Sequence, residues 1–175
     1  LINNSGIFTK VYFPRIIIPI TPIFSGLIDF LISTLIIFLM LFIYGIKPNM
    51  NLIWFPVISL IMMLFSASIG LWMSALAIQY RDIKHAMQFF VQIMMYSAPV
   101  VWPISLLGEK LGDSFIFWYG FYPMVGVIES FRAMFIAQSP MPWDLIFQGI
   151  FSSIVMFYFG LMYFNGREKV FADIA

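Results

Sequence analysis

Charged side chains are scarce in this 175-residue sequence: 10% of the residues are Asp, Glu, Lys or Arg, whereas 62% are hydrophobic. A soluble domain is about half apolar and about a quarter charged. The polar residues are too few to cover an aqueous surface, so we expect lipid to surround most of the chain. The formal net charge of +1 excludes a general electrostatic attraction to nucleic acid.

Cysteine is absent, and histidine occurs once, at position 85. Disulfides and thiolate metal sites are therefore excluded, and a histidine-based metal site within one chain is not expected. The sequence also lacks a phosphate loop of the form G-x-x-x-x-G-K-[ST] and the enzyme motifs G-x-S-x-G and H-E-x-x-H. We therefore predict that the chain binds no cofactor and catalyses no reaction of its own.

The sequence begins with Leu1 and the polar segment LINNSG, which lacks the basic and apolar regions of a signal peptide. We interpret it as part of a longer chain whose preceding residues include membrane spans.

Long hydrophobic runs dominate what is present and predict an all-α membrane protein. A helix needs about 20 apolar residues to cross the hydrocarbon core of a bilayer. Four segments meet this requirement: residues 23–44, 53–78, 85–103 and 145–164. Residues 1–22 mix basic residues, asparagines and prolines, and they are expected at the cytoplasmic surface. Residues 165–175 form a charged tail on the same side.

Residues 104–142 are too polar and too interrupted to form two more spans. They contain two short apolar pieces, Ser114–Phe121 and Met124–Ala137. Segments that enter a membrane without crossing it are tolerated where they are buried in protein or line a wet cavity. We expect a re-entrant pair of short helices on the outer face of the membrane.

The distribution of lysine and arginine predicts the orientation, because cytoplasmic loops carry an excess of these residues. With residues 1–22 inside, six basic residues are cytoplasmic: Lys10, Arg15, Arg81, Lys84, Arg167 and Lys169. Three lie on the outer side: Lys47, Lys110 and Arg132.

A polar stripe follows the predicted third span. His85, Gln88, Gln92 and Tyr96 fall within a narrow arc of a helix with 3.6 residues per turn. Amides that face lipid would lack hydrogen-bond partners, so the stripe must face another helix or water. Two interpretations stay open: hydrogen bonding between helices, and a wet translocation path.

Glu129 and Arg132 are three residues apart and can pair on one helix face. The pair is either a local solvated ion pair or part of a gate that meets a polar substrate.

Small residues repeat every four positions at Ser66, Gly70 and Ser74, and again at Gly149 and Ser153. Such spacing lets helix backbones approach closely in lipid.

Four segments together resemble the permease subunits of ABC-2-type exporters for polysaccharides such as O-antigen, capsule and teichoic acid. They are TKVYFPR at Thr9–Arg15 with Pro19 after it, YRD at Tyr80–Asp82, SAPVVWP at Ser97–Pro103, and REKVFADIA at the end. Their order and spacing agree along nearly the whole chain. One departure is Tyr122 before Pro123, where the family often has asparagine.

The resemblance implies a single ABC-2 transmembrane domain over residues 1–175, within a permease of six spans in the inner (cytoplasmic) membrane. It implies two permease copies around a central channel and two separate ATPase subunits that bind ATP and Mg²⁺. The expected cargo is a lipid-linked polysaccharide. Residues 1–22 would belong to the segment that contacts the ATPase.

The resemblance and the charge pattern together predict three groups of site residues. The candidate ATPase-coupling residues are Thr9, Lys10, Phe13, Pro14, Arg15, Tyr80, Arg81 and Asp82. The candidate path residues are His85, Gln88, Gln92 and Tyr96. The candidate outer-gate residues are Pro99, Pro103, Pro123, Glu129 and Arg132.

Two other functions remain open. One is a membrane-embedded transferase that acts on lipid-linked sugars, which would need an Asp- or His-rich cluster outside this sequence. The other is an ABC-2 permease for drugs or other small molecules, against which the YRD and FADIA segments argue.

Overall fold

The computed structural model describes residues 17–46, 49–80, 82–136 and 140–174, and within these residues it contains helices and no strands. The helices follow the chain in the order α2 (Ile17–Ile43), the 3₁₀ helix η2 (Met50–Trp54), α3 (Phe55–Gln79), α4 (Ile83–Ser97), α5 (Ile104–Leu111), α6 (Asp113–Tyr119), α7 (Pro123–Phe135) and α8 (Trp143–Ile174). The predicted all-α class is confirmed.

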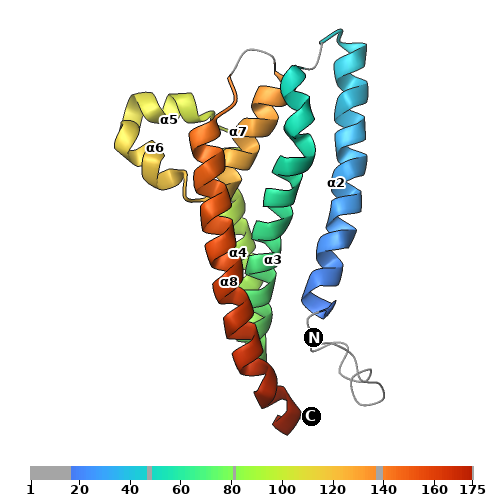
Figure 1. The fold of residues 1–175 in the computed structure, drawn as a ribbon, viewed down its shortest axis with the longest axis vertical. Coiled ribbons are helices and arrows are strands. Elements are labelled where there is room, and N and C mark those ends of the chain that lie inside the picture. The colour runs from blue at the N-terminus through green and yellow to red at the C-terminus, as the bar shows by residue number, and fades with distance from the viewer. Residues whose placement is uncertain (1–16, 47–48, 81, 137–139, 175) are drawn as a thin grey trace.

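Three described helical segments are long and apolar enough to cross a membrane: Thr21–Ile43, Met50–Ala77 and Trp143–Gly166. They correspond to the predicted spans at 23–44, 53–78 and 145–164. Figure 1 shows α2, α3 and α8 side by side, with the end of α2 and the starts of α3 and α8 at one end of the bundle. We call this the upper end and the opposite one the lower end.

The fourth predicted span, 85–103, is a shorter helix than expected. Helix α4 has 15 residues, which at about 1.5 Å per residue reach roughly 22 Å and not the ~30 Å of a hydrocarbon core. It ends because Ala98 precedes Pro99 and takes an extended conformation, with φ −80° and ψ 143°. The helix therefore ends before Pro99, and a span over residues 85–103 stays a prediction.

Residues 104–142 contain three helices, one more than predicted. Helices α6 and α7 match the two expected apolar pieces, and α5 was not foreseen. Gly112 separates α5 from α6 with φ +82°, a conformation that favours glycine. Helices α5 and α6 pack on each other and project sideways at the upper end (Figure 1), whereas α7 packs against α3 and α8.

The start of the first described helix and the end of the last one also differ from the expectation. Helix α2 already begins at Ile17, so Pro22 lies inside it, whereas the sequence predicts a surface segment over residues 1–22 and a span only from residue 23. Helix α8 continues through the predicted tail as far as Ile174.

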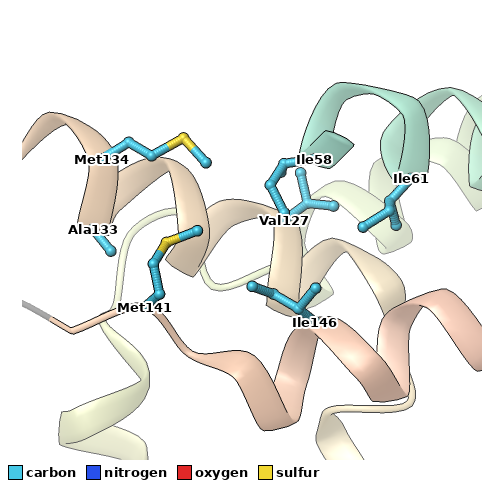
Figure 2. Packing of buried hydrophobic residues seen from close by; sticks show 7 residues of the cluster. All are labelled: Ile58, Ile61, Val127, Ala133, Met134, Met141 and Ile146. Atoms are coloured by element: carbon cyan, nitrogen blue, oxygen red, sulfur yellow. The ribbon is translucent and has the colours of Figure 1, made fainter. Parts of the chain in front are cut away.

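The main buried core lies where α3, α7 and α8 meet. Figure 2 shows its seven side chains, which are Ile58, Ile61, Val127, Ala133, Met134, Met141 and Ile146. Glycine brings the backbones together around it: a Cβ built at Gly126 would lie 2.6 Å from the carbonyl oxygen of Leu145. On the other side of this contact, a Cβ at Gly149 would lie 3.4 Å from the Cα of Pro123. The close packing predicted for Gly149 is therefore confirmed.

The small-residue face predicted on α3 is not the face that packs on α8. Ser68 is fully buried, and a Cβ at Gly160 of α8 would lie 3.3 Å from its carbonyl oxygen. Ser66, in contrast, is exposed. The close contact with α8 is made at Ser68, two residues from Ser66.

Candidate functional site

Most of the candidate ATPase-coupling residues lie outside the described part of the chain: Thr9, Lys10, Phe13, Pro14, Arg15 and Arg81. Tyr80 and Asp82 are described, and both are exposed where α3 ends and α4 begins. The Tyr80 hydroxyl accepts a hydrogen bond of 3.2 Å from Nε2 of Gln79. The beginning of α2 and the end of α8 lie at the same lower end of the bundle (Figure 1).

The four candidate path residues on α4 lie on an open face of the described chain. His85, Gln88 and Gln92 are exposed, and Tyr96 keeps 80% of its surface accessible. The apolar face of α4 is open as well, with Phe89 at 67% exposure. No described side chain of α4 is buried.

A cavity of about 490 Å³ lies between α2, α3, α4 and α7. Apolar side chains dominate its lining, among them Leu27, Met62 and Met124. Helix α4 contributes Val91, Met94 and Met95, and none of the four path candidates. The cavity is suited to hydrocarbon, and the polar stripe faces elsewhere.

The candidate gate residues Glu129 and Arg132 form an ion pair on α7. Their side chains are only 12% and 23% exposed, respectively, so the interpretation as a solvated surface pair is wrong. Arg132 also donates to the carbonyl oxygens of Pro99, at 3.0 Å, and Val100, at 3.3 Å. Glu129 accepts a 2.8 Å hydrogen bond from the backbone N–H of Ile104.

Glu129 thereby satisfies an N–H at the start of α5, where Pro103, the residue before the helix, provides no side-chain cap. The first N–H groups of a helix lack partners within the helix, and a carboxylate there is favoured by the helix dipole. Pro99 is buried beside this network, and Pro123 is buried at the start of α7. The structure thus brings Pro99, Glu129 and Arg132 together, with Pro103 adjacent.

Two tyrosines extend this network to the last turn of α4. The Tyr122 hydroxyl donates to the carbonyl oxygen of Met94 at 2.9 Å, and the Tyr119 hydroxyl donates to that of Ser97. Burial raises the pKa of Tyr122 to about 12, with a smaller contribution from Tyr119. Burial, and then the charge of Glu129, raise the pKa of Tyr119. Both hydroxyls therefore stay protonated and able to donate near neutral pH.

No cluster of three or more His, Cys, Asp or Glu residues that could hold a metal ion occurs among the residues the structure describes.

Comparison with known proteins identifies the family. The model of the ABC-2 type transporter family matches residues 7–136. The chain belongs to the ABC-2 type transporter family. Its membership agrees with the long apolar helices and identifies a multi-pass membrane protein.

This ABC-2 chain is similar to proteins named O-antigen export system permease protein RfbA. One from Klebsiella pneumoniae is 28% identical over 174 residues, which are 99% of this chain and 65% of the relative. One from Myxococcus xanthus is 23% identical over 171 residues, which are 98% of this chain and 65% of the relative. The chain thus spans about two thirds of the length of these relatives. No solved structure matches the chain.

Tyr119 and Tyr122 are the residues of this ABC-2 site that the sequence analysis did not identify. Tyr122 was noticed only as a departure before Pro123. A buried tyrosine hydroxyl usually has a hydrogen-bond partner. This rule predicts that such a partner exists, but it does not say which atom it is. The partners are main-chain carbonyls 22 and 28 residues away in sequence, which no pattern of side chains encodes.

Proposed function

We propose that this chain is the membrane-spanning part of the permease of an ATP-driven exporter, which moves a lipid-linked polysaccharide outward across the cytoplasmic membrane. The similarity to O-antigen export permeases over 99% of the chain carries this proposal. The polysaccharide class is supported further by the YRD and FADIA segments. The chain itself supplies no catalytic group in this proposal.

The energy for export would enter through contact with a separate ATPase, present in two copies. A pump needs an energy source, and the sequence has no phosphate loop. The coupling surface in this proposal combines Thr9–Arg15 with the Tyr80–Asp82 turn. Support comes from the fold, because the end of α3 at Gln79 and the start of α4 at Ile83 lie at the same end of the bundle as the start of α2, which Thr9–Arg15 precedes in sequence (Figure 1).

A second permease copy would complete the translocation path. The polar stripe from His85 to Tyr96 lies on an exposed face of α4, and the cavity inside the described bundle is apolar. Polar side chains in a membrane must face water or protein. Two copies that face each other across their α4 helices would enclose a polar passage between them.

The upper end would form the outer gate. In this proposal α4 and the turn that follows it, up to Pro103, together make the fourth crossing, because the helix alone reaches roughly 22 Å. Helices α5 to α7 would then form the re-entrant part on the outer face. The orphan backbone groups of the turn are satisfied by protein, as a membrane environment requires.

Charge reversal of the coupling residues tests the proposal. Arg15→Glu and Arg81→Glu are expected to lower ATPase stimulation and export while membrane insertion stays intact. Lys110→Glu, on the opposite side, is the matched control and should leave coupling unchanged. Normal export by both inner variants would contradict the coupling surface. Co-purification of a stoichiometric ATPase supports an exporter, whereas product formation without ATP would indicate a transferase.

A further inference from the structure

Four side chains form hydrogen bonds to the main chain of the connection between α4 and α5. The five hydrogen bonds join these side chains to backbone N–H and C=O groups between residues 94 and 104. We call these four side chains the α4–α5 clamp: Tyr119, Tyr122, Glu129 and Arg132. The ion pair between the last two orients the guanidinium toward its carbonyl acceptors.

The clamp adds hydrogen bonds where the backbone of α4 runs out of its own. The last carbonyls of a helix lack N–H partners within the helix. The clamp supplies a donor to the carbonyl of Ser97 and a second donor to that of Met94, which also accepts a 3.2 Å hydrogen bond from the N–H of Ala98. Charged donors and acceptors make hydrogen bonds roughly twice as strong as neutral ones. The bonds of Arg132 and Glu129 are therefore the stronger half of the clamp.

Helix α4 has little else to hold its upper end. Phe89 and Tyr96 on its two faces are both exposed, at 67% and 80%. Met94 is among its more covered side chains, and Met94 also carries one of the clamped carbonyls.

The clamp residues lie on or next to α7, which is itself firmly packed. Helix α7 packs closely on α8, because Gly126 lets the backbone of Leu145 approach. Val125, Val127 and Ser130 on α7 are all buried at 2% exposure or less. The clamp residues on and next to α7 therefore keep the position that the α7–α8 packing sets.

We infer that the clamp side chains are positioning residues, which fix the upper end of α4 and the start of α5 to the α7–α8 unit. The polar stripe of α4 and the short helices α5 and α6 then move together with α7. This inference rests on the proposed function only in its consequence: if the stripe lines the path, the clamp sets the width of the path at its outer end. Arg132 and Glu129 act on the connection and do not contact the exported molecule.

Distances between spin labels test the inference, and the absence of cysteine makes site-specific labelling simple. One pair is Val101→Cys in the connection with Ile154→Cys on α8, both exposed at 77% and 54%. The control pair is Leu60→Cys on α3 with Ile154→Cys. The protein is the full chain in lipid nanodiscs, diluted with unlabelled protein so that only distances within one chain are measured.

Tyr122→Phe removes one hydroxyl. It should raise the population of molecules in which the α4–α5 connection has separated from α7 roughly five-fold. Arg132→Gln removes charged hydrogen bonds and should raise the same population on the order of 30-fold. Both are seen as a wider Val101–Ile154 distance distribution with the Leu60–Ile154 distribution unchanged. Glu129→Gln keeps an acceptor for the N–H of Ile104 but removes the charge that pairs with Arg132, so it should widen the Val101–Ile154 distribution less than Arg132→Gln does. Tyr158→Phe, at an exposed tyrosine of α8, should change neither distribution.

An unchanged Val101–Ile154 distribution in Tyr122→Phe and Arg132→Gln would overturn the inference. Equal widening of the control pair would also overturn it, because the side chains would then support the whole bundle. The readout is a distance within the chain and does not depend on any cargo. A failure of the exporter proposal would appear instead as absent export by the wild-type protein, with the distance results unaffected.

Discussion

At the scale of single residues, two glycines of similar helical setting have opposite surroundings. Gly126 on α7 faces the backbone of Leu145, and an added Cβ would lie 2.6 Å from its oxygen. Gly26 on α2 has no atom within 4 Å of such a Cβ. The first glycine is required by packing, whereas the second carries only the cost of glycine within a helix.

Gly126→Ala is therefore expected to destabilise the protein by about 1–3 kcal/mol, since the contact is with backbone and cannot be relieved by a rotamer change. Gly26→Ala is the matched control and should be neutral or stabilising by roughly 0.5–1 kcal/mol. Thermal unfolding of the detergent-solubilised protein measures both. Equal stability of Gly126→Ala and the wild type would contradict the described α7–α8 contact.

At the scale of elements, α4 is the helix whose position matters most for the proposed path. Its polar stripe and part of its apolar face are exposed within the described chain, and the clamp binds its last turn. A helix of this kind is either covered by another protein surface or borders water on its polar side. The amides of the stripe contact another helix in one interpretation and line a wet translocation path in the other. Substitution of the glutamines distinguishes the two.

We expect Gln88→Leu combined with Gln92→Leu to lower export about 30-fold, because two lost amide contacts at about 1 kcal/mol each amount to about 2 kcal/mol. Phe89→Leu, on the other face of α4, should leave export near the wild-type level. The assay is the appearance of polysaccharide at the cell surface, with protein abundance in the membrane as the control for folding. Unchanged export in the double variant would contradict a role of the stripe in the path and would indicate that it serves helix packing.

At the scale of the whole molecule, the upper end of the bundle gathers the starts of α3 and α8 and the helices α5 to α7 (Figure 1). The rings of Trp54 and Trp143 meet edge to face there, with centroids 4.9 Å apart. Trp118 is 73% exposed on α6. Tryptophan is enriched at both membrane–water interfaces, so this end is expected to lie at an interface, and the distribution of lysine and arginine assigns it to the outer one.

Labelling of single cysteines in intact cells tests this orientation. A maleimide that cannot cross membranes should react with Glu109→Cys and Asp144→Cys, and with Asp82→Cys only after permeabilisation; all three wild-type residues are exposed. The reverse pattern would contradict the orientation derived from lysine and arginine. Reaction of Glu109→Cys and Asp144→Cys from different sides would instead show that α7 crosses the membrane, against the re-entrant prediction.

Composition and hydropathy alone determined the membrane class, the all-α fold and the three long spans, because an unbroken apolar run of sufficient length has no other stable form in lipid. The end of helix α4 before Pro99 could also be predicted from the sequence, since proline disfavours a helical conformation in the residue before it. The tertiary structure decided that Ser68, two residues from Ser66, faces α8, and that Tyr122 holds the end of α4. Lipid and protein interior are equally apolar, so hydrophobic periodicity does not distinguish the helix face that meets a neighbour from the face that meets lipid. Partners of Tyr122 and Arg132 are main-chain atoms, which only the assembled fold brings within reach.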